Sequence, residues 1–217
     1  MSPASDASAG SAPDQTPAAA ARKRPKPGER RVQILQVLAE MLQQPGAERV
    51  TTAALAARLA VSEAALYRHF ASKAQMFEAL IDFIESSVFG LIGQINERES
   101  AGRTRAARIV AMVLQFGEKN PGMARVMVGD ALVFEHERLQ QRMNQFFDKL
   151  DAALRQCLRD GSQGNPVEPV RLTPDTDAQV RASVLTAFVA GRLQRFARSG
   201  FRRAPTEQLD ACMAYML

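Results

Sequence analysis

The sequence is poor in the residues on which most enzyme sites depend. Its 217 residues include no tryptophan, two cysteines and two histidines. Cys157 and Cys212 match no zinc-binding spacing, and His69 and His136 lie far apart along the chain. The chain also has no glycine-rich phosphate loop and no carboxylate pair with supporting groups. We therefore expect no enzyme, no metal site and no bound cofactor.

Long apolar runs are missing as well. No stretch approaches the roughly 18 consecutive apolar residues that a membrane-spanning helix requires. The first 21 residues are mostly Ala, Ser, Pro and Gly, and they lack the apolar core of a signal peptide. The sequence therefore predicts a cytoplasmic protein without a membrane partner, in which residues 1–28 form a disordered tail with a basic end.

Strand-like alternation is scarce, whereas Ala, Leu, Arg and Gln are plentiful, so the sequence predicts an all-α fold. An amphipathic helix is expected over about 29–43, with an inner face formed by Val32, Leu35, Leu38 and Leu42. A linking helix is expected over about 73–92, and its inner residues are Met76, Phe77, Leu80, Ile81, Ile84 and Val88. The linking helix is long enough to join an N-terminal head, residues 29–75, to a larger helical module, residues 76–217.

Two short helices with a tight connection lie between these segments. The first is expected over about 52–59, capped by Thr51 or Thr52, and the second follows Ser62, whose hydroxyl can accept a hydrogen bond from a first-turn amide. Glu63 then stands where the helix dipole favours an anion. This pattern predicts a helix-turn-helix, which places its second helix in the major groove of duplex DNA. The alternative from local spacing alone is a plain helical hairpin with no ligand.

The charge distribution favours a polyanionic partner for the head. The whole chain has a formal net charge of +5. Residues 22–73 hold ten Lys and Arg against four Asp and Glu, whereas residues 74–217 hold eighteen against seventeen. A basic excess confined to the predicted reading head is the electrostatic signature of a nucleic-acid-binding surface.

The module is predicted to contain several helices. One is expected over 105–117, the turn at 118–122 ends it, and a helical run begins near Met123. A long helix is expected over 135–159, followed by a flexible connection over 161–174. The next helix is capped by Asp175 or Asp177 and presents Val180, Val184, Ala187, Phe188, Gly191 and Leu193. The two long helices either form a two-fold four-helix interface, which we prefer, or bury each other within one chain.

The head resembles TetR-type regulators in T-T-A-A-L-A-A-R-L-A-V-S-E-A-A-L-Y-R-H-F-A-S-K, residues 51–73. The L-Y-x-H-F-x-x-K ending is particular to that superfamily. The resemblance implies that the capping Thr, the Tyr, the His and the Lys hold phosphates, which assigns these roles to Thr52, Tyr67, His69 and Lys73. It also implies that the residues nearest the groove are Ser62, Glu63, Ala64 and Arg68.

Beyond the head, F-I-E-S-S-V and the segment F-G-E-K-N-P-G-M-A-R-V-M-V-G-D-A-L-V-F-E-H-E-R-L-Q-Q-R-M-N-Q-F-F resemble the SlmA family of nucleoid occlusion factors over about residues 29–200. The resemblance implies a nucleoid-associated homodimer that binds specific duplex DNA, with the number of dimers per site open. When DNA-bound, such proteins antagonise assembly of the division GTPase FtsZ. By analogy the FtsZ surface is expected around Phe83, Leu91, Met112 and Lys119. The tail, Gly90, Gly93 and the short ending A-Y-M-L depart from the family.

A second function remains open, because a TetR-type head also suits a ligand-responsive repressor. An inducer pocket would then be lined by Met112, Phe116, Met123, Met127 and Phe134. Met and Phe at helical spacing are more often core residues than pocket residues, and no convergent polar group accompanies them.

Overall fold

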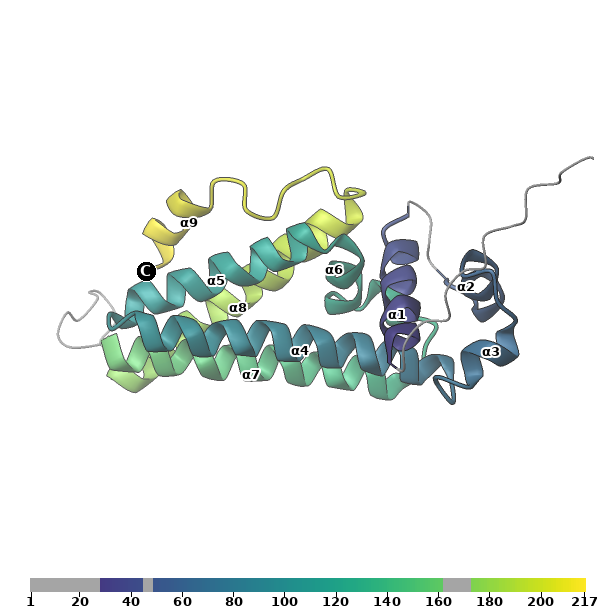
Figure 1. The fold of residues 1–217 in the computed structure, drawn as a ribbon. Helices are drawn as coiled ribbons and strands as arrows, with labels where there is room; N and C mark the ends of the chain where they lie inside the picture. The colour runs from purple at the N-terminus through teal and green to yellow at the C-terminus, as the bar shows by residue number, and fades with distance from the viewer. Residues whose placement is uncertain (1–27, 45–48, 162–172) are drawn as a thin grey trace, which may run out of the picture.

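The computed structural model describes residues 28–44, 49–161 and 173–217, and every regular element in these ranges is a helix (Figure 1). This confirms the all-α prediction. The elements are α1 Glu29–Leu42, α2 Thr52–Arg58, α3 Glu63–Tyr67, α4 Lys73–Arg98, α5 Gly102–Lys119, α6 Pro121–Met127, the 3-10 turn η1 Asp130–Leu132, α7 Glu137–Gly161, α8 Pro174–Arg198 and α9 Leu209–Met216. In the described residues, no helix is both long and apolar enough to cross a bilayer. The tail and most of the 161–174 connection lie outside these ranges.

The head consists of α1, α2 and α3, and its core lies where they meet the start of α4. The buried side chains of α1 are Ile34, Leu38 and Leu42, which recur every four residues along one side of the helix. Val32 is 55% exposed, so its assignment to the inner face was wrong. The inner stripe runs through Ile34 instead, because both choices have helical spacing and only the position of α4 and α6 decides between them.

α4 is one continuous helix that joins the head to the module (Figure 1). All six residues predicted for its inner face are buried, but the helix continues to Arg98 and does not end near residue 92. Gly90 and Gly93 do not interrupt it, because both face open space on its outer side. The inner side remains apolar through Ile92, and this packing offsets the weak helix propensity of glycine.

The long helices of the module bury their wide apolar faces within one chain. α7 runs beside α4, and α7 and α8 pack along their lengths (Figure 1). The buried residues of α8 are Ala178, Ala182, Leu185, Val189, Leu193 and Phe196. Of the six residues predicted on the exposed stripe of α8, Leu193 therefore belongs to the chain's own core. The helix is capped by Thr173, whose hydroxyl accepts from the amide of Thr176 at 3.2 Å, and not by Asp175 or Asp177.

α6 joins the module to the back of the head. Gly122 lies directly against α1, since a Cβ built on it would stand 2.2 Å from the carbonyl oxygen of Ala39. The guanidinium of Arg125 donates to the carbonyl of Leu42 at 3.3 Å, at the end of α1. The predicted turn between α5 and α6 is shorter than expected, because only Asn120 separates the two helices. Head and module therefore share a close backbone contact.

This contact predicts the effect of adding one methyl group. Gly122→Ala places a Cβ inside the van der Waals shell of a backbone oxygen, so α6 and α1 must separate. Overpacking of this kind costs about 1–3 kcal/mol of unfolding free energy, which urea denaturation would measure. Gly93→Ala is the control, because its Cβ meets nothing within 4 Å and alanine favours a helix, so it should stabilise slightly. Equal effects of the two substitutions would contradict the proposed contact.

Candidate nucleic-acid interface

The connection between α2 and α3 is a tight turn. Ala60 adopts a left-handed backbone with φ 53°, and the amide of Val61 donates to the carbonyl of Ala56 at 3.0 Å. Val61 is half-buried against the core of the head, as expected for a residue that fills the angle between two helices. The turn therefore sets α3 at a fixed angle to α2, and this is the geometry of a helix-turn-helix.

The cap of α2 is Thr51 and not Thr52. The hydroxyl of Thr51 accepts from the amide of Ala54 at 3.2 Å. Thr52 is the first helical residue, and its hydroxyl donates to the carboxylate of Glu63 at 2.6 Å. The capping threonine, to which the resemblance assigns a phosphate contact, is therefore Thr51, and that contact stays a prediction. Thr52 and Glu63 instead tie the starts of the two helices together.

α3 presents an exposed polar face on a capped helix. The hydroxyl of Ser62 accepts from the amide of Ala65 at 3.3 Å, which confirms the predicted cap. The side chain of Tyr67 is 44% exposed. The other predicted contacts on this element, Ser62, Glu63, Ala64, Arg68 and His69, are exposed too. Leu66 and Phe70 are buried on the opposite side, as their spacing predicted, so the polar face cannot turn inward.

Arg31 on α1 supports the end of α3, a contact that no local pattern in the sequence predicts. Its guanidinium donates to the carbonyl of His69 and lies 4.1 Å from the ring centroid of Phe70. A charged donor on this carbonyl, with its planar group on an aromatic ring, holds the exit of the reading helix. Arg31 had been counted only as part of the basic excess, because nothing local links residues 31 and 69.

Lys73 is not a free cation. Its ammonium forms an ion pair and hydrogen bond with the carboxylate of Glu135, in the turn before α7. The Glu135 side chain is 9% exposed, whereas that of Lys73 is 22% exposed. Lys73 follows the reading helix closely in the chain, but sixty-two positions separate it from Glu135, so no local pattern indicates the pair.

The residues expected to contact a protein partner lie along the neighbouring sides of α4 and α5. Phe83 on α4 is 49% exposed, and its ring centroid is 6.5 Å from that of Phe116 on α5. Met112 is half-buried one turn before Phe116. Leu91 lies two turns farther along α4, and Lys119 is exposed at the end of α5. The structure thus brings Phe83 near Phe116, while Leu91 and Lys119 lie towards opposite ends of the same surface.

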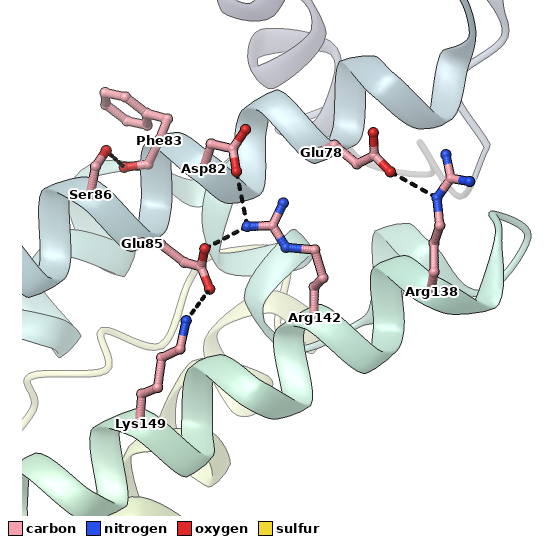
Figure 2. Close-up of polar contacts among 8 residues, drawn as sticks. All are labelled: Glu78, Asp82, Phe83, Glu85, Ser86, Arg138, Arg142 and Lys149. Carbon is pink, nitrogen blue, oxygen red and sulfur yellow. Dashed lines mark hydrogen bonds and ion pairs between the residues drawn. The ribbon is translucent and has the colours of Figure 1, made fainter.

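A row of ion pairs holds the opposite side of α4 to α7 (Figure 2). Glu78 pairs with Arg138 at 2.7 Å, Asp82 with Arg142 at 2.9 Å, and Glu85 with both Arg142 and Lys149. Figure 2 shows Phe83 pointing away from this row. Partial burial by itself lowers the pKa of Arg142, but hydrogen bonds to the two carboxylates outweigh it and raise the pKa above its ordinary value. Glu78, Asp82 and Glu85 of α4 are therefore engaged by α7, and the apolar side chain of Phe83 points away from them.

The structure divides the five residues expected for an inducer pocket between the core and the surface. Met123 and Met127 are core residues, whereas Phe134 is 63% exposed. Met112 and Phe116 are half-buried on the α5 surface described above. The inducer pocket of the repressor hypothesis stays a prediction.

The two threonines at the start of α2 give a direct test of the capping geometry. Thr51→Ala should lower the unfolding free energy by about 1 kcal/mol, because it leaves a first-turn amide without its acceptor. Thr52→Val keeps the side-chain shape and removes only the exposed bond to Glu63, so it should cost less. Urea denaturation of both variants measures the difference. A larger loss of unfolding free energy for Thr52→Val than for Thr51→Ala would indicate that Thr52 is the cap.

Two family models match the chain, one on each part. The model described as bacterial regulatory proteins, tetR family, covers residues 34–80. The SlmA-like model described as Tetracyclin repressor-like, C-terminal domain, covers residues 101–217. The first match ends at residue 80 within α4, the second begins at residue 101 after α4, and both α2 and α3 lie within the first.

Curated relatives and solved structures agree with these matches. The nucleoid occlusion factors SlmA of Salmonella newport (strain SL254) and Salmonella enteritidis PT4 (strain P125109) are each 48% identical over 192 residues, which are 88% of this chain and 94% of theirs. A TetR-like transcriptional regulator from Rhodococcus sp. RHA1 has a TM-score of 0.68 at 17% identity, covering 88% of this chain and 97% of its own. FadR from Bacillus subtilis in complex with stearoyl-CoA has a TM-score of 0.62 at 12% identity, covering 85% and 96%. These structural likenesses show the fold alone, whereas the sequence matches show that the chain belongs to the TetR family and, within it, to the SlmA family of nucleoid occlusion factors.

Proposed function

We propose that this protein is a nucleoid occlusion factor, which binds specific sites on duplex DNA and, when DNA-bound, inhibits assembly of FtsZ. The observation that carries the proposal is 48% identity to nucleoid occlusion factors SlmA over 88% of the chain. Two surfaces support it, namely the polar face of α3 and the apolar surface between α4 and α5. Because it binds DNA, the protein would be located on the nucleoid.

The DNA-binding surface is supported by the way the head exposes polar groups. The Thr51 hydroxyl and the amides at the start of α2 are available to one phosphate, and Tyr67 and His69 to the flanking backbone. Ala64 and Arg68 lie on the face that would approach base edges, where a small residue allows close contact and a guanidinium can bind guanine. Glu63 is engaged by Thr52, so its contribution is to position the two helices.

Lys73 has a role that depends on Glu135. A lysine ammonium has three donors, so Lys73 can bind a phosphate while it remains paired with the carboxylate. The pair nevertheless weakens its attraction for phosphate, because Glu135 brings a negative charge to the same place. Glu135 thereby limits the affinity for DNA. Because it lies just before α7, it also couples phosphate binding by Lys73 to the position of that helix.

This arrangement predicts opposite effects for the two members of the pair. Lys73→Gln should weaken binding several-fold on every DNA sequence, because a phosphate contact carries no base information. Glu135→Gln should strengthen binding about as uniformly, because it removes a negative charge beside the phosphate. Fluorescence anisotropy on two unrelated duplexes measures both. Glu137→Gln is the control, and Glu135→Gln affinity no higher than that of this control would refute the role given to Glu135.

A homodimer is supported by a second apolar stripe on α8. Val180, Val184, Ala187 and Gly191 are exposed along one side of this helix, and Gly191 has open space where a side chain would be. A stripe of small and branched residues on a straight helix suits close packing against its own symmetry mate. Pairing two heads would let the protein bind two half-sites, each too short to bind firmly alone.

Disrupting the stripe should separate the two copies. Val184→Glu buries a charge at the two-fold contact, so sedimentation velocity should report a monomer and DNA affinity should fall about 100-fold or more, given the loss of one half-site. Val133→Glu is the matched control for the sedimentation measurement, since Val133 is an exposed valine away from α8. A Val184→Glu protein that still sediments as a dimer would exclude this stripe as the interface.

The partner surface is supported by apolar side chains that the chain leaves uncovered between two long helices. Phe83 and Phe116 approach each other from α4 and α5, and Met112 extends the surface along α5. Apolar side chains exposed along two neighbouring helices suit a short segment of a partner protein. Leu91 and Lys119 would contact its ends.

The proposed function is tested by sedimentation of polymerising FtsZ with this protein, with and without its selected DNA. We expect DNA-dependent loss of polymer. Phe83→Ala should retain DNA affinity and lose this activity, because it removes the most exposed ring of the surface. Phe134→Ala is the matched control, as Phe134 is an exposed phenylalanine outside it. No effect of the unaltered protein in either condition would overturn the proposal and favour an ordinary transcriptional repressor.

A further inference from the structure

The end of α8 and the turn after it are rich in arginine and poor in acidic residues. Residues 178–206 include six arginines and no Asp or Glu, and Glu207 follows them. Arg181 pairs with Asp177, and Arg192 donates to the carbonyl of Glu207 while lying over the ring of Phe188. The remaining four are exposed, and in the described residues none has a carboxylate partner: Arg195, Arg198, Arg202 and Arg203. These four define the arginine surface.

Most of the other arginines of the module have carboxylate partners. They pair with acids on neighbouring helices or turns, as Arg105 does with Asp160 at 2.7 Å and Arg138 with Glu78 at 2.7 Å. The negative end of the α8 dipole explains why cations favour its last turn. That reason covers Arg195 and Arg198 but not Arg202 and Arg203, which lie beyond the helix.

The turn that carries Arg202 and Arg203 is firmly built. The Ser199 hydroxyl donates to the carbonyl of Phe196 at 2.8 Å and accepts from the amides of Arg202 and Arg203 at 3.1 and 3.0 Å. Phe201 adopts a left-handed backbone, unusual for phenylalanine, and its ring packs edge-on against Phe196 with centroids 5.2 Å apart. The guanidiniums are therefore displayed by a preorganised turn, which lowers the entropy cost of binding an anion.

A DNA duplex bound to the reading head would not contact the arginine surface. α8 packs against α6 and α6 packs against α1, and in Figure 1 the end of α8 lies on one side of α1 whereas α2 and α3 lie on the other. The reading helix and the arginine surface therefore lie on opposite sides of α1. A straight duplex in contact with α3 would leave these four arginines unoccupied, so a protein partner fits them better.

The arginine surface instead borders the proposed FtsZ surface. Thr206, in the segment after the turn, donates to the Glu118 carboxylate at 2.5 Å, which places this segment against the last turn of α5, next to Lys119. Arg195, Arg202 and Arg203 line an open hollow of about 700 Å³ together with Ala204, Thr206 and Glu207. A partner segment that extends from the apolar surface between α4 and α5 past Lys119 would therefore reach the guanidiniums of the arginine surface.

We propose that the arginine surface binds an acidic segment of the same partner protein whose apolar residues contact the apolar surface between α4 and α5. This inference rests on the proposed function. Guanidiniums form paired hydrogen bonds with carboxylates, so an extended run of Asp or Glu matches the surface in charge and in geometry. The apolar surface then selects apolar side chains, and the arginine surface selects the acidic residues that accompany them.

The test uses FtsZ sedimentation with the full-length protein saturated with its selected DNA. Arg202→Glu/Arg203→Glu should raise the concentration of protein needed to halve the polymer by about tenfold, because it replaces attraction by repulsion. Arg103→Glu is the control, since Arg103 is also exposed and has no carboxylate partner in the described residues, but lies at the other end of α5. It should remain within about twofold of the unaltered protein. Thermal melts of both variants establish that they fold.

Three outcomes separate the hypotheses. If the unaltered protein does not affect FtsZ, the proposed function fails, and this inference fails with it. If it does and the double variant matches the Arg103→Glu control, the arginine surface is not part of the interaction. A fall in DNA affinity for the double variant would assign the surface to DNA and overturn the proposal in favour of a nucleic-acid contact.

Discussion

The architecture depends on α4 remaining one unbroken helix whose apolar side belongs to two cores at once. Its buried residues run from Met76, beside the head, to Ile92, deep in the module. Because one rigid element is packed at both ends, the head cannot rotate without disturbing the module. Gly122 strengthens this constraint by bringing α6 onto the backbone of α1. The polar face of α3 and the apolar surface beside Phe83 are therefore held in a fixed relation.

The distribution of charge follows from the same packing. Three of the four acidic side chains of α4, Glu78, Asp82 and Glu85, are engaged by α7, and these partly exposed ion pairs contribute little to stability. The near-balance of charges in residues 74–217 had suggested a neutral module. In the fold, paired charges are gathered along α4 and α7, and unpaired arginines remain at the end of α8. The net charge of each segment predicted the basic head. It did not predict this second basic surface, because the acids elsewhere in residues 74–217 balance its arginines in the count.

Local signals predicted much of the reading head and less of its surroundings. The Ser62 cap, the buried Leu66 and Phe70, and the apolar side of α4 were predicted correctly, because each depends on neighbours within about four residues. The sequence left the cap of α2 open between Thr51, which is the cap, and Thr52, and it placed the cap of α8 a few positions too late, since neighbouring Thr and Asp side chains offer several acceptors with similar propensity. The individual DNA and FtsZ contacts remain predictions, as does the two-fold use of α8.

The sequence by itself determined the helical class, the helix-turn-helix and the side of each long helix that would be buried. This was possible because hydrophobic periodicity and helix capping depend on residues that are only a few positions apart. Only the tertiary structure decided what covers each side: that Glu135 pairs with Lys73, that Arg31 supports the carbonyl of His69, and that α7 covers one stripe of α8 while another stays exposed. These partners lie tens of residues apart in the chain. Hydrophobic periodicity predicts which face of a helix is buried, but it does not predict which other element packs against that face.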